Sequence, residues 1–185
     1  GAAGIAIANL LLDADFTNIT LVDSKGVINA ARDDLNSYKQ AVLDRFETPK
    51  VGTVHEALSG ADVFIGVSKG DIIKAGDVQR MNDDALVLAM SNPTPELLPE
   101  EAKKAKNIAM YATGRSDLPN QINNAVVFPG LFKGHVDAGV TKVDRGVFIE
   151  VAKALAKMET DDLLPSIIDP KTHQQVAKVV VEYYR

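Results

Sequence analysis

Hydrophobic residues along this chain follow two different spacings, and the switches between them predict alternating strands and helices. Short apolar runs that are rich in β-branched residues and bounded by turn residues are typical of buried strands. Such runs occupy residues 16–23, 61–68, 85–90, 108–114 and 125–130. Apolar residues at helical spacing predict amphipathic or buried helices. These cover the stretch after Gly4 and residues 27–46, 53–58, 77–81, 99–106, 147–158 and 176–183.

This order of elements predicts an α/β fold of the Rossmann-like type. Strands that alternate with helices form a doubly wound, mostly parallel sheet with right-handed crossovers and helices on both faces. From Phe132 onward the pattern is helical, so we expect a helical C-terminal tail. We interpret residues 1–185 as one such domain, in which ligands bind along the carboxyl edge of the sheet.

Small residues stand directly ahead of the first apolar helix. The start of the chain resembles the end of the motif G-x-G-x-x-G, with Gly1 and Gly4 as its last two glycines and Ala2 and Ala3 between them. That turn lets a pyrophosphate approach the backbone N–H groups at a helix N-terminus. The first glycine and the strand before it are absent, so we expect that the chain was cut inside the motif or that residues precede Gly1. An ordinary Gly/Ala-rich helix start is the alternative.

An acid closes the run at 16–23. Asp23 lies roughly 20 residues past the glycines, where the dinucleotide fingerprint places a carboxylate that binds the ribose hydroxyls. Alternatively, it only caps a turn with Ser24, Lys25 and Gly26. Because a carboxylate repels a 2′-phosphate, we expect NAD as the cofactor, while the nearby Lys25 keeps NADP possible.

The run at 61–68 ends in small residues. In a doubly wound sheet the strand ends are where ligands bind, so Gly66, Val67 and Ser68 are placed to contact the adenosine half of a dinucleotide. A plain strand-to-helix turn is an equally open interpretation for Ser68.

Amide side chains occur at two other predicted strand boundaries. Asn92 follows the run at 85–90, and Pro93 restricts its backbone to extended conformations. Asn123 and Asn124 belong to an amide-rich run directly ahead of 125–130. Amides both donate and accept, which suits recognition of a carboxylate or a carboxamide, although a solvated loop is the alternative for the second run.

Composition narrows the class of protein. The chain has 185 residues, of which 46% are hydrophobic, enough for a buried core. A net charge of −5 without a basic cluster argues against nucleic-acid binding, and no apolar run reaches the ~20 residues of a membrane span. Zero cysteines exclude disulfides and suit a cytoplasmic protein. We interpret His55, His135 and His173 as structural or surface residues and Thr160-Asp161-Asp162 as a solvated turn.

These blocks together resemble the NAD(P)-binding domain of malic enzymes, particularly the short bacterial type. The most specific parts of the likeness are Ser91-Asn92-Pro93-Thr94-Pro95-Glu96 and Ala112-Thr113-Gly114-Arg115-Ser116-Asp117 with the segment that follows to Gly130. The likeness also includes the glycine turn, Leu21 to Gly26 and Phe64 to Ser68, so it covers nearly the whole chain.

The resemblance implies an activity for the intact protein. Malic enzymes oxidise malate with NAD or NADP and a divalent metal, Mg²⁺ or Mn²⁺, and decarboxylate the bound oxaloacetate to pyruvate. It implies that Asn92, Asn123 and Asn124 lie by the nicotinamide and the malate, and that Asp23 lies by the adenosine ribose. The family's catalytic tyrosine, lysine and metal-binding carboxylates precede the glycine turn. We therefore expect no catalytic residue or metal ligand within 1–185, and a homodimer formed through the intact protein.

Two other functions remain open from the sequence. A malolactic enzyme shares this architecture and retains NAD while it forms lactate from malate. A non-catalytic regulatory module that binds a dinucleotide would also carry these motifs.

Overall fold

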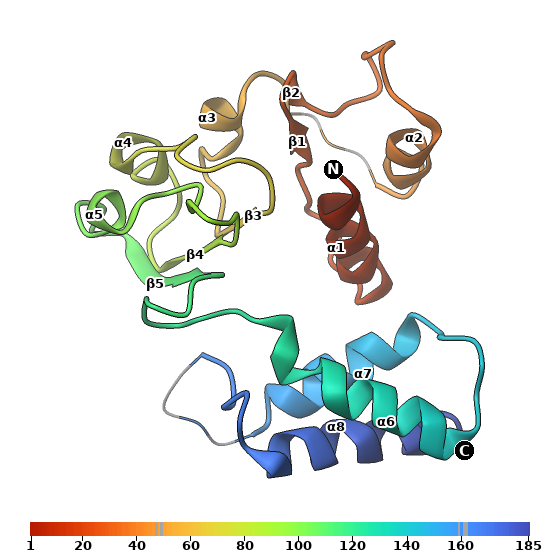
Figure 1. Ribbon diagram of the computed structural model, residues 1–185. Helices are drawn as coiled ribbons and strands as arrows, with labels where there is room; N and C mark the ends of the chain where they lie inside the picture. The colour runs from red at the N-terminus through yellow and green to blue at the C-terminus, as the bar shows by residue number, and fades with distance from the viewer. Residues whose placement is uncertain (47, 49, 159, 161–162) are drawn as a thin grey trace. The chain divides into compact units, whose positions relative to one another are not determined.

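The computed structural model describes residues 1–46, 48, 50–158, 160 and 163–185. The chain divides into two units, Gly1–Pro119 and Asn120–Arg185. The first contains the strands with surrounding helices, and the second is helical (Figure 1). Asp161 and Asp162, which belong to the turn expected after Thr160, lie outside the described residues.

Three parallel strands form the centre of the first unit. β3 (Val63–Gly66), β4 (Ala85–Ala89) and β5 (Ile108–Thr113) pair in this order. Each lies inside a run that the sequence predicts as a strand, so these three predictions are confirmed. Parallel strands need crossover connections, and the short helices between them supply these. Every second residue of β4 is fully buried, because helices pack on that face.

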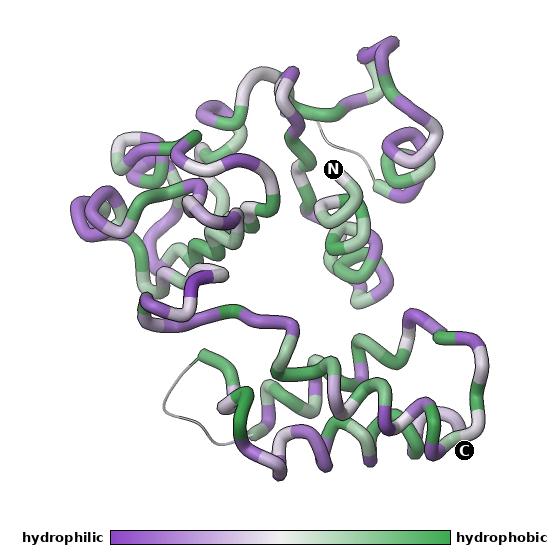
Figure 2. Tube along the Cα trace, viewed as in Figure 1, coloured by the Kyte–Doolittle hydropathy of each residue, from purple (hydrophilic) through white to green (hydrophobic). Residues whose placement is uncertain are grey.

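Helices flank this sheet. α3 (Val54–Ala57), α4 (Ala75–Val78) and α5 (Pro99–Ala102) alternate with the strands along the chain. Apolar residues of these helices and their adjoining loops pack against β4: Leu58, Ile73, Val78, Met81, Leu97, Ala102 and Ala105. Figure 2 shows hydrophobic residues concentrated in the strands and polar ones on α4 and α5. α1 (Ala2–Asp13) lies on the other side of β3 from α4 and α5 (Figure 1). The Rossmann-like α/β fold is thereby confirmed.

The strand predicted at 16–23 is wrong over most of its length. Only β1 (Val22–Asp23) is a strand, and it pairs antiparallel with β2 (Gly26–Val27) around a tight turn. Strand structure needs a neighbouring ladder. The Leu21 carbonyl still accepts from the Ile28 N–H at 2.8 Å, but residues 17–20 pair with no strand among the described residues. Ile19 and Leu21 pack instead on the apolar cluster that includes Ala8 of α1.

The helix predicted at 27–46 is also wrong at its start. The helix here, α2 (Ser37–Leu43), begins only after Asn36, whose side chain accepts a hydrogen bond from the Lys39 N–H at 3.0 Å. The preceding segment folds around the guanidinium of Arg32, which binds two carboxylates. Charge-assisted hydrogen bonds of this kind outweigh the modest helix propensity of the segment.

Residues 125–130, predicted as a strand, are helical in the second unit. They form the 3₁₀ turn η1 (Asn124–Val126) and the start of α6 (Phe128–Ala138). Gly130 and Gly134, one helical turn apart, let α6 approach α8 (Pro170–Tyr183) closely: a Cβ at Gly134 would lie 2.5 Å from the Cβ of Val180. Close helix packing therefore decides the structure of this apolar stretch.

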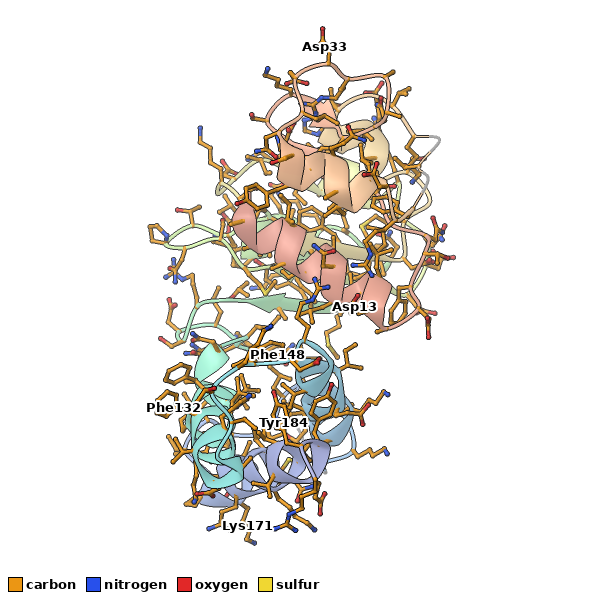
Figure 3. All side chains as sticks on the ribbon, turned by 90° about the vertical axis from the view of Figure 1, so that its right-hand side faces the viewer. Asp13, Asp33, Phe132, Phe148, Lys171 and Tyr184 are labelled. Atoms are coloured by element: carbon orange, nitrogen blue, oxygen red, sulfur yellow. The ribbon has the colours of Figure 1, made fainter. Side chains whose placement is uncertain are left out.

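The second unit is completed by α7 (Gly146–Leu155), a predicted helix that is confirmed. The core of the second unit comprises Val126, Val147, Val151, Leu155, Val176 and Val180. Tyr184 lies among the helices, whereas Phe132 lies on the outer side of α6 (Figure 3). The Tyr184 hydroxyl accepts a hydrogen bond from the Asp144 N–H at 2.9 Å and lies 3.2 Å from Nε2 of buried His135. His135 thus has a structural role, as expected.

Candidate functional site

The first turn of α1 lies beside the end of β3. Gly1 is the N-cap residue, and no side chain caps the free N–H groups of the first turn. A Cβ at Gly4 would lie 3.7 Å from Cγ2 of Val67. The N–H groups of this first turn carry a partial positive charge, which suits a phosphate group.

A buried carboxylate that the sequence reasoning missed joins the carboxyl ends of β3 and β4. Glu96 has 0% of its surface exposed. Its Oε1 accepts a hydrogen bond from the Ser68 N–H at 2.7 Å, and its Oε2 accepts one from the Ser91 N–H at 2.9 Å. The structure therefore brings Gly66, Val67 and Ser68 together with the loop of Asn92. The loop motif contained Glu96, but only the fold shows where its carboxylate lies.

Asn92 is exposed at the start of the loop after β4. The Asn92–Pro93 peptide bond is cis, and the Ser91 hydroxyl donates to the carbonyl of Thr94. From the loop after β5, Nη1 of Arg115 donates to the carbonyl of Pro93 at 3.1 Å, and its guanidinium also pairs with Asp117. Loops from two neighbouring strands thus fix the backbone that carries the Asn92 amide.

Tyr111 on β5 is a poor candidate for proton transfer. Its hydroxyl donates to the carbonyl of Leu97 at 2.6 Å. Burial, with smaller contributions from the charges of Glu100 and Glu96, raises the pKa of Tyr111 to about 12. It stays protonated near neutral pH and is held by the Leu97 carbonyl, so we assign it a structural role.

Asp23 lies in a network of cations. Its Oδ1 accepts from the Lys25 N–H at 2.9 Å and from Nη1 of Arg32 at 2.8 Å. Its Oδ2 accepts from Nη2 of Arg32 at 3.1 Å and from the ammonium group of Lys39. Burial disfavours ionisation, but these hydrogen bonds outweigh it and hold the pKa of Asp23 well below its usual range. All four acceptor positions of the carboxylate are thereby used.

Arg32 has all five of its N–H donors bound. Besides Asp23, it donates through Nε and Nη2 to Asp34, at 2.8 and 2.9 Å, and through Nη1 to the carbonyl of Gly26 at 3.4 Å. Asp34 also pairs with Nζ of Lys25 at 2.6 Å. The hydrogen bonds from Arg32 and then Lys25 hold the pKa of Asp34 below its usual range. The sequence predicted Asp23 and Lys25 as cofactor residues but did not identify Arg32 or Lys39.

Asn123 and Asn124 belong to the second unit, so the structure describes them separately from the strand edge. Oδ1 of Asn123 accepts from the Ala125 N–H at 2.9 Å and caps η1. Asn124 is exposed as the first residue of that turn.

In the part of the chain that the structure describes, no three His, Cys, Asp or Glu side chains gather in a group that could hold a metal ion. Within the same residues, no helix has the length and hydrophobicity needed to cross a membrane.

Several known proteins resemble this chain over almost its whole length. The family model described as "Malic enzyme, NAD binding domain" matches residues 1–183. The NAD-dependent malic enzyme of Geobacillus stearothermophilus is 41% identical over 98% of this chain and 39% of its own length. The bifunctional malic/malolactic enzyme of Bacillus subtilis is 37% identical over 98% of this chain and 46% of its own.

A solved structure has the same fold. The crystal structure of the NAD-dependent malic enzyme from Thermotoga maritima superposes with a TM-score of 0.89 at 36% identity, over 98% of this chain and 49% of that one. The chain therefore spans less than half the length of these relatives. Relatives include NAD-dependent and NADP-dependent malic enzymes. The match to the family model and these relatives over almost the whole chain show that it belongs to the malic enzyme family, as the NAD-binding domain.

Proposed function

We propose that this chain is the cofactor-binding domain of an enzyme that oxidises malate and decarboxylates the product to pyruvate and CO₂ with reduction of NAD(P). The observation that supports it most is the match to the malic enzyme NAD-binding domain over residues 1–183. The first turn of α1, which lies beside Val67, fits a dinucleotide phosphate at this place.

The cofactor supplies the hydride acceptor, and this chain supplies position. The backbone groups that hold the diphosphate belong to the turn at the start of α1: Gly1, Ala2, Ala3 and Gly4. The end of β3 contacts the adenosine half through Gly66, Val67 and Ser68. Amide groups orient the nicotinamide and the malate: Asn92, Asn123 and Asn124. Each of these amides can pair with a carboxamide or a carboxylate, the groups that the two molecules present.

We propose NAD rather than NADP as the preferred cofactor. An arginine near the ribose is what accommodates the 2′-phosphate of NADP in this type of fold. Here every donor of Arg32 is bound to Asp23, Asp34 or the carbonyl of Gly26. To bind a ribose hydroxyl, Asp23 exchanges one of its present hydrogen bonds, whereas a 2′-phosphate finds no unbound donor on Arg32.

The remaining machinery is proposed to lie outside residues 1–185. This comprises the proton-transfer residues and the carboxylates that bind Mg²⁺ or Mn²⁺. A metal held there would supply Lewis-acid chemistry, which polarises hydroxyl and carbonyl oxygens. We also propose a cytoplasmic homodimer. Less than half of each relative is represented by this chain, which leaves ample sequence for these parts.

Malolactic activity is the second candidate, because the Bacillus subtilis relative is named as both malic and malolactic. One assay separates the two. The intact enzyme is incubated with malate, Mn²⁺ and either NAD or NADP, and pyruvate, lactate and reduced cofactor are quantified. Pyruvate with an equal amount of NADH supports the first proposal, and lactate without net NADH supports the second. If neither product forms while NAD still binds, a regulatory module becomes the better interpretation.

A further inference from the structure

The carboxylate of Glu96 has an unusual place for an acidic side chain. It is fully buried, yet it lies where two adjacent parallel strands end. Its two oxygens accept hydrogen bonds from the backbone N–H groups of Ser68 and Ser91. Ser68 is 28 residues away in sequence, so this contact fixes one strand end against the other. An acid is rarely buried this deeply unless its oxygens are satisfied by such donors.

The surrounding backbone leaves this carboxylate little room. A Cβ at Gly66 would lie 2.5 Å from Cδ of Glu96 and 2.7 and 2.8 Å from its oxygens, so only glycine fits at the last position of β3. The carbonyl of Glu96 also accepts from the N–H groups of Ile72 and Ile73, at 3.0 and 3.1 Å. The residue is therefore held by its main chain while its side chain holds the two strand ends.

We propose that Glu96 is a positioning residue of the cofactor site: its carboxylate sets the backbone at Ser68 and Ser91 and thereby places Ser68 and Asn92 for the dinucleotide. This inference rests on the proposed function of those two residues. Ser68 and Asn92 are exposed, whereas the carboxylate that orders their backbone is not. Glu96 acts through them and does not touch the ligand.

The test is Glu96→Gln in the intact enzyme. Glutamine has nearly the same shape, but its amide nitrogen cannot accept, so one of the two backbone N–H groups would face a second donor in a buried place. We expect the Kd of NADH or NADPH, measured by nicotinamide fluorescence, and the KM of the cofactor to rise about tenfold to hundredfold, the scale of a buried donor left unpaired. The measurements are made well below the unfolding midpoint of each variant.

Glu101→Gln is the matched control. The carboxylate of Glu101 also accepts a backbone N–H from a distant segment, that of Ala75 at 3.1 Å, but it joins α5 to the start of α4 rather than two strand ends. This variant is expected to lose stability without a change in cofactor Kd. Glu96→Asp serves as a second variant, because it keeps the charge but is too short to reach both N–H groups.

The outcomes separate the two proposals. If the wild-type enzyme binds neither NADH nor NADPH, the proposed function fails. If the wild-type enzyme binds and both Glu96 variants bind equally well, the role of Glu96 is refuted and the function stands. If both Glu96 variants fail to fold, the positioning role of Glu96 is also refuted, because Glu96 would then be needed for folding and not specifically for the cofactor site. A raised Kd in folded Glu96 variants, with an unchanged Kd in Glu101→Gln, supports the proposal.

Discussion

At the residue scale, we expect the carboxylate of Asp23 to affect both the cofactor preference and the stability of the domain. We expect Asp23→Ala to shift the cofactor preference towards NADP by about tenfold or more, because Lys39 and the N–H groups of Arg32 that bind Asp23 lose this acceptor and become available to a 2′-phosphate. The ratio of kcat/KM for NADP and NAD measures the shift. The matched control is Asp13→Ala, which removes a carboxylate paired with Arg45 at the far end of α1 and should leave the ratio unchanged. An unchanged ratio in Asp23→Ala would contradict the assignment.

Asp23 also makes stability depend on pH. Its folded pKa lies below the ordinary value of 3.8, so its stabilisation is fully present above that value and is lost as the pH falls through the folded pKa. We expect Asp23→Asn to lower the free energy of unfolding by about 1–3 kcal/mol at pH 7, the scale for charged hydrogen bonds. The difference from wild type should shrink progressively below about pH 4. Urea unfolding at pH 7 and pH 3 tests this, and a difference that is the same at both would refute it.

Residue types and spacing could predict some of the site but not its side-chain network. The glycine turn and Asp23 were identifiable because a known fingerprint relates them. Arg32, Lys39 and Glu96 were not, since their partners lie 9, 16 and 28 residues away and only the folded chain brings them together. The helical spacing at 27–46 also predicted a helix where the structure has the loop that carries Arg32.

At the scale of elements, the glycines of α6 control how closely it packs on α8. In Gly134→Ala the added carbon would lie 2.5 Å from Cβ of Val180 and 2.8 Å from the carbonyl oxygen of Ala177. We expect a loss of about 1–3 kcal/mol in the free energy of unfolding, as for an overpacked interface. Gly76→Ala in α4 is the control, because its Cβ meets nothing within 4 Å and alanine is favoured in helices. Urea titrations followed by circular dichroism compare the two; equal stabilities would contradict the packing argument.

The same packing explains which elements the sequence could predict. The strands β3, β4 and β5 are short apolar runs between turn residues, and local pattern and tertiary structure agree there. Residues 125–130 are equally apolar, but Gly130 and Gly134 give them a helical partner in α8. Periodicity cannot distinguish a short buried strand from the start of a buried helix, because the structure depends on the element that packs against the segment.

At the scale of the whole molecule, this chain corresponds to one part of its longer relatives. The relatives named as malic enzymes are more than twice as long as the region that this chain matches. Hydride transfer requires malate held against the nicotinamide, and correct orientation alone is worth roughly 7–11 kcal/mol of the barrier. A domain that positions only the cofactor should therefore bind without turnover.

We accordingly expect isolated residues 1–185 to form no NADH from malate, even with saturating NAD and Mn²⁺. Under the proposed function, the proton-transfer residues and the metal-binding carboxylates lie outside residues 1–185, and the isolated domain would then lack the groups that activate the substrate. The intact enzyme, or the missing part supplied in trans, should restore turnover under the same conditions. Absorbance at the NADH band measures the rate, with a mock purification as the control for host enzymes. Malate-dependent NADH formation by the isolated domain above that control would show that the catalytic groups lie within these residues.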